Sequence, residues 1–224
     1  MTAALGWGAL SASSLVIGAL LGISRRWPDV LIGLVLAFGA GALISAVSFD
    51  LAEEGVNVGG GAAVAGGLAI GALTYWGASH ALPDSGGTAL ALGAFLDGIP
   101  EQAVLGIGLA SGEGVSVGLL AAIFVSNLPE AIGSAADMKA SKARILGLWV
   151  AVAIVCTLAT VAGYAIADTT GGKLRAGIDG FAAGALLVML IDSMIPDARR
   201  QGGPAAGLVT VLGFAVAAAL TGVA

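Results

Sequence analysis

The chain has 224 residues, of which 58% are hydrophobic and only 10% are charged. Its mean hydropathy is +1.02, which excludes an ordinary water-soluble domain, in which about a quarter of residues are charged. A net charge of −5 without a basic stripe argues against nucleic acid as a partner. The single cysteine, Cys156, excludes a disulfide framework and a cage of thiolate ligands. We therefore expect an integral membrane protein.

Eight stretches are long enough to cross a bilayer, for which a helix needs about 20 apolar residues. They are 4–24, 29–54, 60–79, 89–111, 115–138, 145–167, 178–197 and 204–223. Clusters of Pro, Gly and charge separate them at 25–29, 56–61, 81–88, 112–114, 139–144, 168–177 and 199–204. The expected fold class is all-α, a polytopic membrane protein with eight transmembrane helices and no soluble domain.

The distribution of positive charge indicates the orientation, because Lys and Arg accumulate in cytoplasmic loops. Seven of the nine lie on one side of an eight-helix arrangement: Arg25, Arg26, Lys139, Lys142, Arg144, Arg199 and Arg200. Only Lys173 and Arg175 fall on the other side, in the connection before the seventh stretch. Both termini are therefore expected outside the cell, in a multi-pass protein of the plasma or inner membrane.

An internal repeat relates the two ends of the chain. A shift of 143 residues aligns Leu5–Ile23 with Leu148–Ile166, and Phe38–Ile44 with Phe181–Leu187. The copies start an odd number of helices apart, so they run in opposite directions through the membrane. We expect a single domain, 1–224, composed of a first repeat (1–81), a central helix pair (82–143) and a second, inverted repeat (144–224). Inverted repeats are typical of secondary transporters.

A shorter echo lies within the central pair, where Phe95–Glu101 matches Phe124–Glu130 at a spacing of 29. Asp97 and Glu101 are four residues apart and therefore share a helical face, and Pro100 between them kinks the helix and frees a backbone carbonyl. The second turn carries a similar polar set, namely Ser126, Asn127 and Glu130 around Pro129. Buried ionisable groups in membrane spans are costly and mark functional sites. We expect these oxygen ligands to form a midplane cation site, with a proton relay as the alternative or additional role.

A second acidic set lies near the ends of helices. Asp50 and Glu53 end the second stretch on the outer side, and Asp192 and Asp197 end the seventh on the inner side. We expect them to concentrate cations at the outer and inner mouths of the path, with Asp50 and Asp192 lying deeper than Glu53 and Asp197. Asp137 is expected to reach the interface or pair with Lys139, and His80 to be an ordinary interfacial residue.

The two Pro-Glu turns make the chain resemble the ZIP (zrt/irt-like) family of divalent metal transporters. The resemblance extends over nearly the whole chain and implies eight spans, outer termini and a metal site on helices 4 and 5. By position, Asp97 and Ser126 replace family histidines, Glu101 keeps the glutamate, and Gln102 stands where a glycine is usual. Asn127 replaces an acid, and Glu130 occupies the position of a second histidine. The acidic residue that many members carry in helix 6 has no counterpart near Thr160.

These departures leave the choice of metal open. The family favours zinc or iron, whereas a site of carboxylates and carbonyls without imidazole favours manganese or another hard ion. We expect divalent metal uptake into the cytoplasm, with the metal as substrate, no permanently bound cofactor and no enzymatic activity. The expected partners are the lipid bilayer and the metal ion, and a homodimer is a candidate assembly. The alternatives are a carrier of a non-metal small solute and a non-transporting membrane scaffold.

Overall fold

The computed structural model describes residues 1–81, 87–110 and 116–221, and it is helical throughout these ranges without a strand. The helices in chain order are α1 (Thr2–Ser24), α2 (Asp29–Ala46), the π-helix η1 (Val47–Glu53), α3 (Glu54–Gly59), α4 (Gly61–His80), α5 (Gly87–Ala110), α6 (Val117–Asp137), α7 (Lys142–Asp168), α8 (Gly172–Met189), the π-helix η2 (Leu190–Met194), α9 (Ile195–Gly202), the 3-10 turn η3 (Gly203–Ala205) and α10 (Ala206–Thr221).

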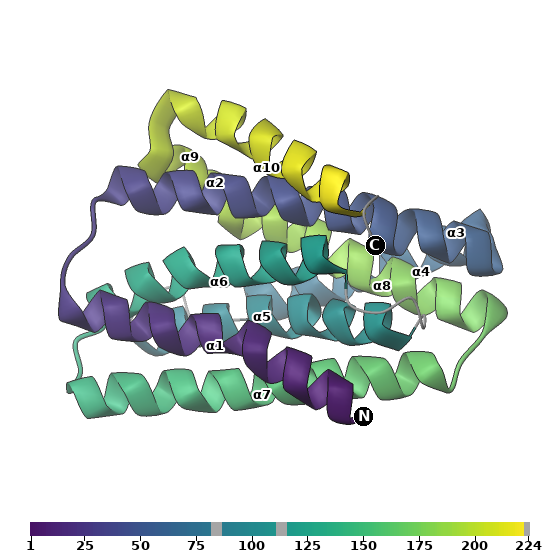
Figure 1. Cartoon of the computed structure of the whole chain (residues 1–224), viewed down its shortest axis with the longest axis horizontal. Helices are drawn as coiled ribbons and strands as arrows, with labels where there is room; N and C mark the ends of the chain where they lie inside the picture. Colours follow the sequence, from purple (N-terminus) through teal and green to yellow (C-terminus); the bar gives the residue numbers. More distant parts are fainter. Residues whose placement is uncertain (82–86, 111–115, 222–224) are drawn as a thin grey trace.

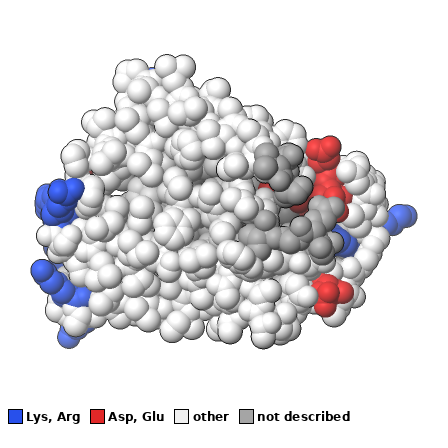
Figure 2. Space-filling view, viewed as in Figure 1, with Lys and Arg blue, Asp and Glu red and all other residues white. Residues whose placement is uncertain are grey.

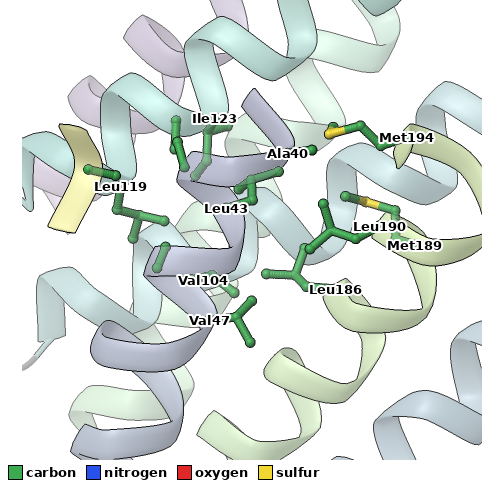
Figure 3. Packing of buried hydrophobic residues seen from close by; sticks show 14 of the residues in the cluster. Ala40, Leu43, Val47, Val104, Leu119, Ile123, Leu186, Met189, Leu190 and Met194 are labelled. Atoms are coloured by element: carbon green, nitrogen blue, oxygen red, sulfur yellow. The ribbon is translucent and has the colours of Figure 1, made fainter. Parts of the chain in front are cut away.

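The long helices lie side by side along one common axis (Figure 1). α4 packs on α8, α10 on α2, α5 on α7, and α1 on both α6 and α7. The central apolar core lies between α2, α5, α6 and the α8–η2 segment. Leu43, Val104, Ile123 and Leu186 meet there with the other side chains of this cluster (Figure 3). Only 22% of the most apolar window of α4 and 28% of that of α7 is buried, as expected for helices on the apolar surface of a membrane protein.

Six stretches of the described chain are long and apolar enough to cross a membrane, so this is a multi-pass membrane protein. They are Thr2–Ser24, Asp29–Gly59, Gly61–His80, Val117–Asp137, Lys142–Asp168 and Gly172–Leu220. The last of these has 49 residues and contains both α8 and α10. Gly203, with φ of 64°, lies where the chain turns back between them, so α10 returns along α2 (Figure 1). A total of eight crossings remains a prediction.

Two helix boundaries differ from those expected. The second helix does not end near residue 54 but continues through η1 and α3 to Gly59, and Gly60 at φ 92° ends it. The seventh begins at Gly172 rather than 178, so Arg175 lies inside a helix instead of in a connection. The expected breaks at 81–88 and 112–114 fall largely or wholly outside the described residues.

The two ends of the molecule differ in charge (Figure 2). The basic end is formed by the α1–α2 connection, the α6–α7 connection and α9, which carry Arg25, Arg26, Lys139, Lys142, Arg144, Arg199 and Arg200. The opposite end carries Glu53 at the end of η1, Glu54 at the start of α3 and Asp168 at the end of α7, together with Lys173 of α8, and we call it the acidic end (Figures 1 and 2).

Candidate metal site

The two proline-containing turns meet inside the molecule. Pro100 lies within α5 and Pro129 within α6, and each is followed by a glutamate. The Ser126 hydroxyl group of α6 donates to the Glu101 carboxylate of α5, with Oγ–Oε1 at 3.2 Å. Both side chains are buried. The structure therefore brings Glu101 and Ser126 together across 25 residues of sequence.

Asp97 is held by hydroxyl groups from two other helices. The Tyr75 hydroxyl group of α4 donates to Asp97 Oδ1, and Ser193 of η2 donates to Oδ2 at 3.2 Å. Asp97 is only 8% exposed, so these hydrogen bonds offset part of the cost of burying its charge. Neither Tyr75 nor Ser193 was identified from sequence. Ser193 could have been, because the 143-residue shift aligns it with Asp50.

A cavity of about 130 Å³ reaches Asp97 and Glu130. Between them and the basic end it passes Asp197, Asp137 and Arg200. A second hollow of about 560 Å³ shares Asp137, Arg200 and three further residues with this cavity, and extends to Arg26 and Asp29. The two hollows together form an acidic path from the Asp97–Glu130 pair to the basic end.

Glu101 and Asn127 do not line this cavity, although both are buried. Asn127 Nδ2 has no hydrogen-bond partner among the described residues. The carboxylates of Asp97, Glu101 and Asp197 all act electrostatically on Glu130. In the described part of the chain, however, no three His, Cys, Asp or Glu side chains are grouped closely enough to hold a metal ion. A complete coordination shell would therefore require either a rearrangement of these side chains or water molecules as additional ligands.

The acidic residues near the helix ends lie in different surroundings. Asp50 is half-buried, and its Oδ2 atom is enclosed with no partner among the described residues, whereas Glu53 is exposed. On the other side the expected order of depth is wrong. Asp197 is half-buried and lines the cavity, but Asp192 is exposed and faces a separate hollow beside His80 and Trp76.

Asp137 is exposed at the end of α6, where an interfacial residue would lie, but the expected pairing with Lys139 is not found in the described part of the chain. The Asp137 side chain lines both hollows of the acidic path. The salt bridges among the described residues, Arg175–Asp179 and Asp197–Arg200, do not include Asp137 and Lys139. Asp137 therefore belongs to the surroundings of the path.

A buried polar chain behind Glu101 connects three helices. Gln102 Nε2 donates to Ser11 Oγ at 3.0 Å, and Thr160 Oγ1 donates to Gln102 Oε1 at 2.9 Å. All three side chains are fully buried. Gln102 and the absence of an acid near Thr160 were separate departures from the ZIP pattern, and the structure shows that the two positions are in contact.

Comparison with known proteins yields one informative similarity. No protein-family model matches the chain. In an alignment of 191 positions that covers 77% of the chain, the sequence is 29% identical to an Arabidopsis thaliana protein named "Putative zinc transporter At3g08650". The chain spans 30% of the length of that relative. The similarity is thus to a protein named for zinc transport, and membership of the ZIP family stays a prediction.

Proposed function

We propose that this protein carries divalent metal cations, such as zinc, iron or manganese, across the cell membrane into the cytoplasm. The observation that carries the proposal is that Asp97 and Glu130, from two proline-containing helices, both line an acidic cavity inside the protein, away from its mouth. Carboxylates inside a protein attract cations strongly, because little water screens them. The similarity to a protein named for zinc transport supports the same class of substrate.

Asp97 and Glu130 are the first ligands in this proposal. Glu101, Ser126 and Asn127 lie directly behind them and supply further oxygen ligands when the metal displaces the present hydrogen bonds. Asp197 serves the inner mouth together with Asp137, because both line the cavity. Asp50 and Glu53 serve the outer mouth. Asp192 is left out of the path because it faces another hollow.

An inverted repeat of eight spans would let such a site open alternately to the two sides. Several features support it. The π-helices η1 and η2 start at Val47 and Leu190, which differ by 143 residues, the offset of the sequence repeat. The packing of α2 on α10 matches that of α8 on α4, and the packing of α1 on α6 matches that of α7 on α5.

Two glycines at the same offset strengthen this correspondence. A Cβ atom on Gly41 would lie 1.8 Å from the Thr210 carbonyl oxygen of α10. On Gly184 it would lie 2.1 Å from the Leu68 carbonyl oxygen of α4. Both contacts are too short for any side chain, so both sites require glycine for the close approach of two helices. The same device thus joins the matching helix pairs of the two halves.

The direction of transport follows from the charge asymmetry. Cytoplasmic loops are enriched in Lys and Arg, which places the basic end inside the cell. The acidic path opens toward that end, so the structure corresponds to the inward-open state of the proposed cycle.

The test is uptake into proteoliposomes across a panel of zinc, iron(II), manganese, magnesium and calcium. We expect uptake of at least one transition metal and its loss in Glu130→Gln. Asp192→Asn is the matched control, because it removes an acid outside the path and should transport like the parent. No uptake of any metal by the folded parent would contradict the proposal and favour the solute-carrier or scaffold alternative. Equal losses in both variants would contradict the site.

A further inference from the structure

An ion pair lies buried near the acidic end, away from the proposed metal site. Arg175 Nε donates to Asp179 Oδ1 at 2.9 Å, one turn apart in α8. The Asp179 side chain is completely buried, and that of Arg175 is 9% exposed. Burying two charges in this way is costly and is weak evidence of a contribution to stability, so the pair calls for another explanation.

The Arg175 side chain also reaches a different helix. Its Nη2 atom donates to the Ile107 carbonyl oxygen of α5 at 2.9 Å. Ile107 lies in the last turn of α5, which leads from the Pro100–Glu101 turn to the acidic end. Arg175 therefore bridges α8 and α5 where these two helices meet that end. A guanidinium group can do this because it has five donors in a fixed fork, of which one set faces Asp179 and another the carbonyl group.

The opposite end of the molecule lacks such a bridge at the matching place. The 143-residue offset relates Arg175 to Ile32 and Asp179 to Leu36. Ile32 and Leu36 both line the cavity that opens toward the basic end. Equivalent positions of the two halves thus hold an ion pair where the helices are joined and two apolar side chains where the path is open.

From this asymmetry we propose that Arg175 and Asp179 form a latch that keeps the acidic end closed. The inference rests on the proposed function only in assuming that the cavity must open alternately to both ends. The latch opens when Arg175 releases the Ile107 carbonyl oxygen, which lets α5 and α8 separate. Asp179 keeps the guanidinium group oriented in the closed state, so it is a positioning residue.

The latch can be tested without any metal, by measuring which end of the protein exposes the centre of the path. In a Cys156→Ala background, Ser193→Cys places one thiol on the cavity beside Asp97. A membrane-impermeant methanethiosulfonate reagent is then applied to right-side-out and inside-out vesicles. In the protein with no other change, which is the parent of this test, the Ser193→Cys thiol should react from the basic end. Arg175→Met should add reaction from the acidic end, at least several-fold above the parent.

Two further variants keep the test decisive. Arg175→Met with Asp179→Leu removes both charges, so it avoids an unpaired buried carboxylate and should fold even if the single variant does not. Lys173→Met is the matched control. Lys173 is exposed and lies two residues before Arg175, so this variant removes a positive charge from the same end without touching the buried pair. We expect the double variant to react from both ends and the control to react like the parent.

A folded double variant that reacts only from the basic end would overturn the latch. The readout is separate from metal uptake, so the two proposals can fail separately. If the double variant reacts from the acidic end while the parent takes up no metal, the latch stands and the transport proposal is rejected. Metal uptake by the parent, with unchanged labelling in the double variant, would support the transport proposal and reject the latch.

Discussion

The hydroxyl group of Ser126 lies 3.2 Å from the carboxylate of Glu101, and this hydrogen bond joins α6 to α5 next to their two prolines. It has a consequence for the order in which ligands act. Glu101 is engaged by a neutral donor behind the cavity, whereas Glu130 already lines the cavity. A cation that is released toward the basic end therefore passes Glu130 and Asp97 last, after it has left Glu101.

Removal of Glu101 should abolish uptake more completely than removal of Asp50. Glu101→Ala leaves the metal with an incomplete ligand shell, while Asp50→Ala chiefly lowers the local concentration of cations. We expect a loss of about tenfold or more for Glu101→Ala and a clearly smaller one for Asp50→Ala, in the range where supporting residues of metal sites act. Initial rates of uptake in proteoliposomes measure both. Equal and small losses would favour a non-transporting protein.

Imidazole ligands should shift the metal preference toward zinc. Asp97→His with Ser126→His introduces nitrogen ligands, which suit zinc better than manganese, and also removes one carboxylate on which hard ions depend. Competitive uptake of zinc and manganese, in variants first checked for folding by size exclusion, measures the shift. If the preference is unchanged or reversed, Asp97 and Ser126 do not line the ion site.

Neighbouring glycines in α4 should respond oppositely to alanine. A Cβ atom on Gly67 would lie 2.0 Å from the Gly177 carbonyl oxygen of α8, so Gly67→Ala forces the two helices apart. Gly66 has no atom within 4 Å of such a Cβ, and Gly66→Ala should stabilise the helix slightly, by up to about 1 kcal/mol. Thermal unfolding in detergent compares them. A Gly67→Ala protein as stable as Gly66→Ala would contradict the close packing of α4 on α8.

The polar chain behind Glu101 should contribute to stability through Thr160. Thr160→Val removes the donor to the buried Gln102 Oε1 atom, which should cost about 1 kcal/mol, as for other hydrogen bonds between membrane helices. Thr157→Val in the same helix is the control, because the Thr157 hydroxyl group donates to the Ala153 carbonyl oxygen of its own helix. Their unfolding temperatures in one detergent give the difference. An equal effect of both substitutions would mean that the contact with Gln102 adds nothing.

Composition and hydropathy alone were sufficient to predict a helical membrane protein, because spans of about 20 apolar residues have few other stable environments. The pairing of Glu101 with the second turn was also predictable. The 29-residue echo places polar residues and prolines at matching points of neighbouring helices, so their side chains were expected to meet. Tyr75, which donates to Asp97, was not predictable in this way, since no repeat in the sequence relates it to a polar residue of another helix.

Only the tertiary structure decided which residues near the helix ends face the path. In an α-helix the side-chain direction can be traced from residue to residue, but a π-helix such as η2 holds an extra residue in its turn and rotates the residues after it. Ser193 consequently points to Asp97, while Asp192 is turned outward beside His80. Likewise, the charge of Arg175 indicated a connection at the surface. The helix that begins at Gly172 instead carries it inside, where Asp179 and the Ile107 carbonyl oxygen accept its hydrogen bonds.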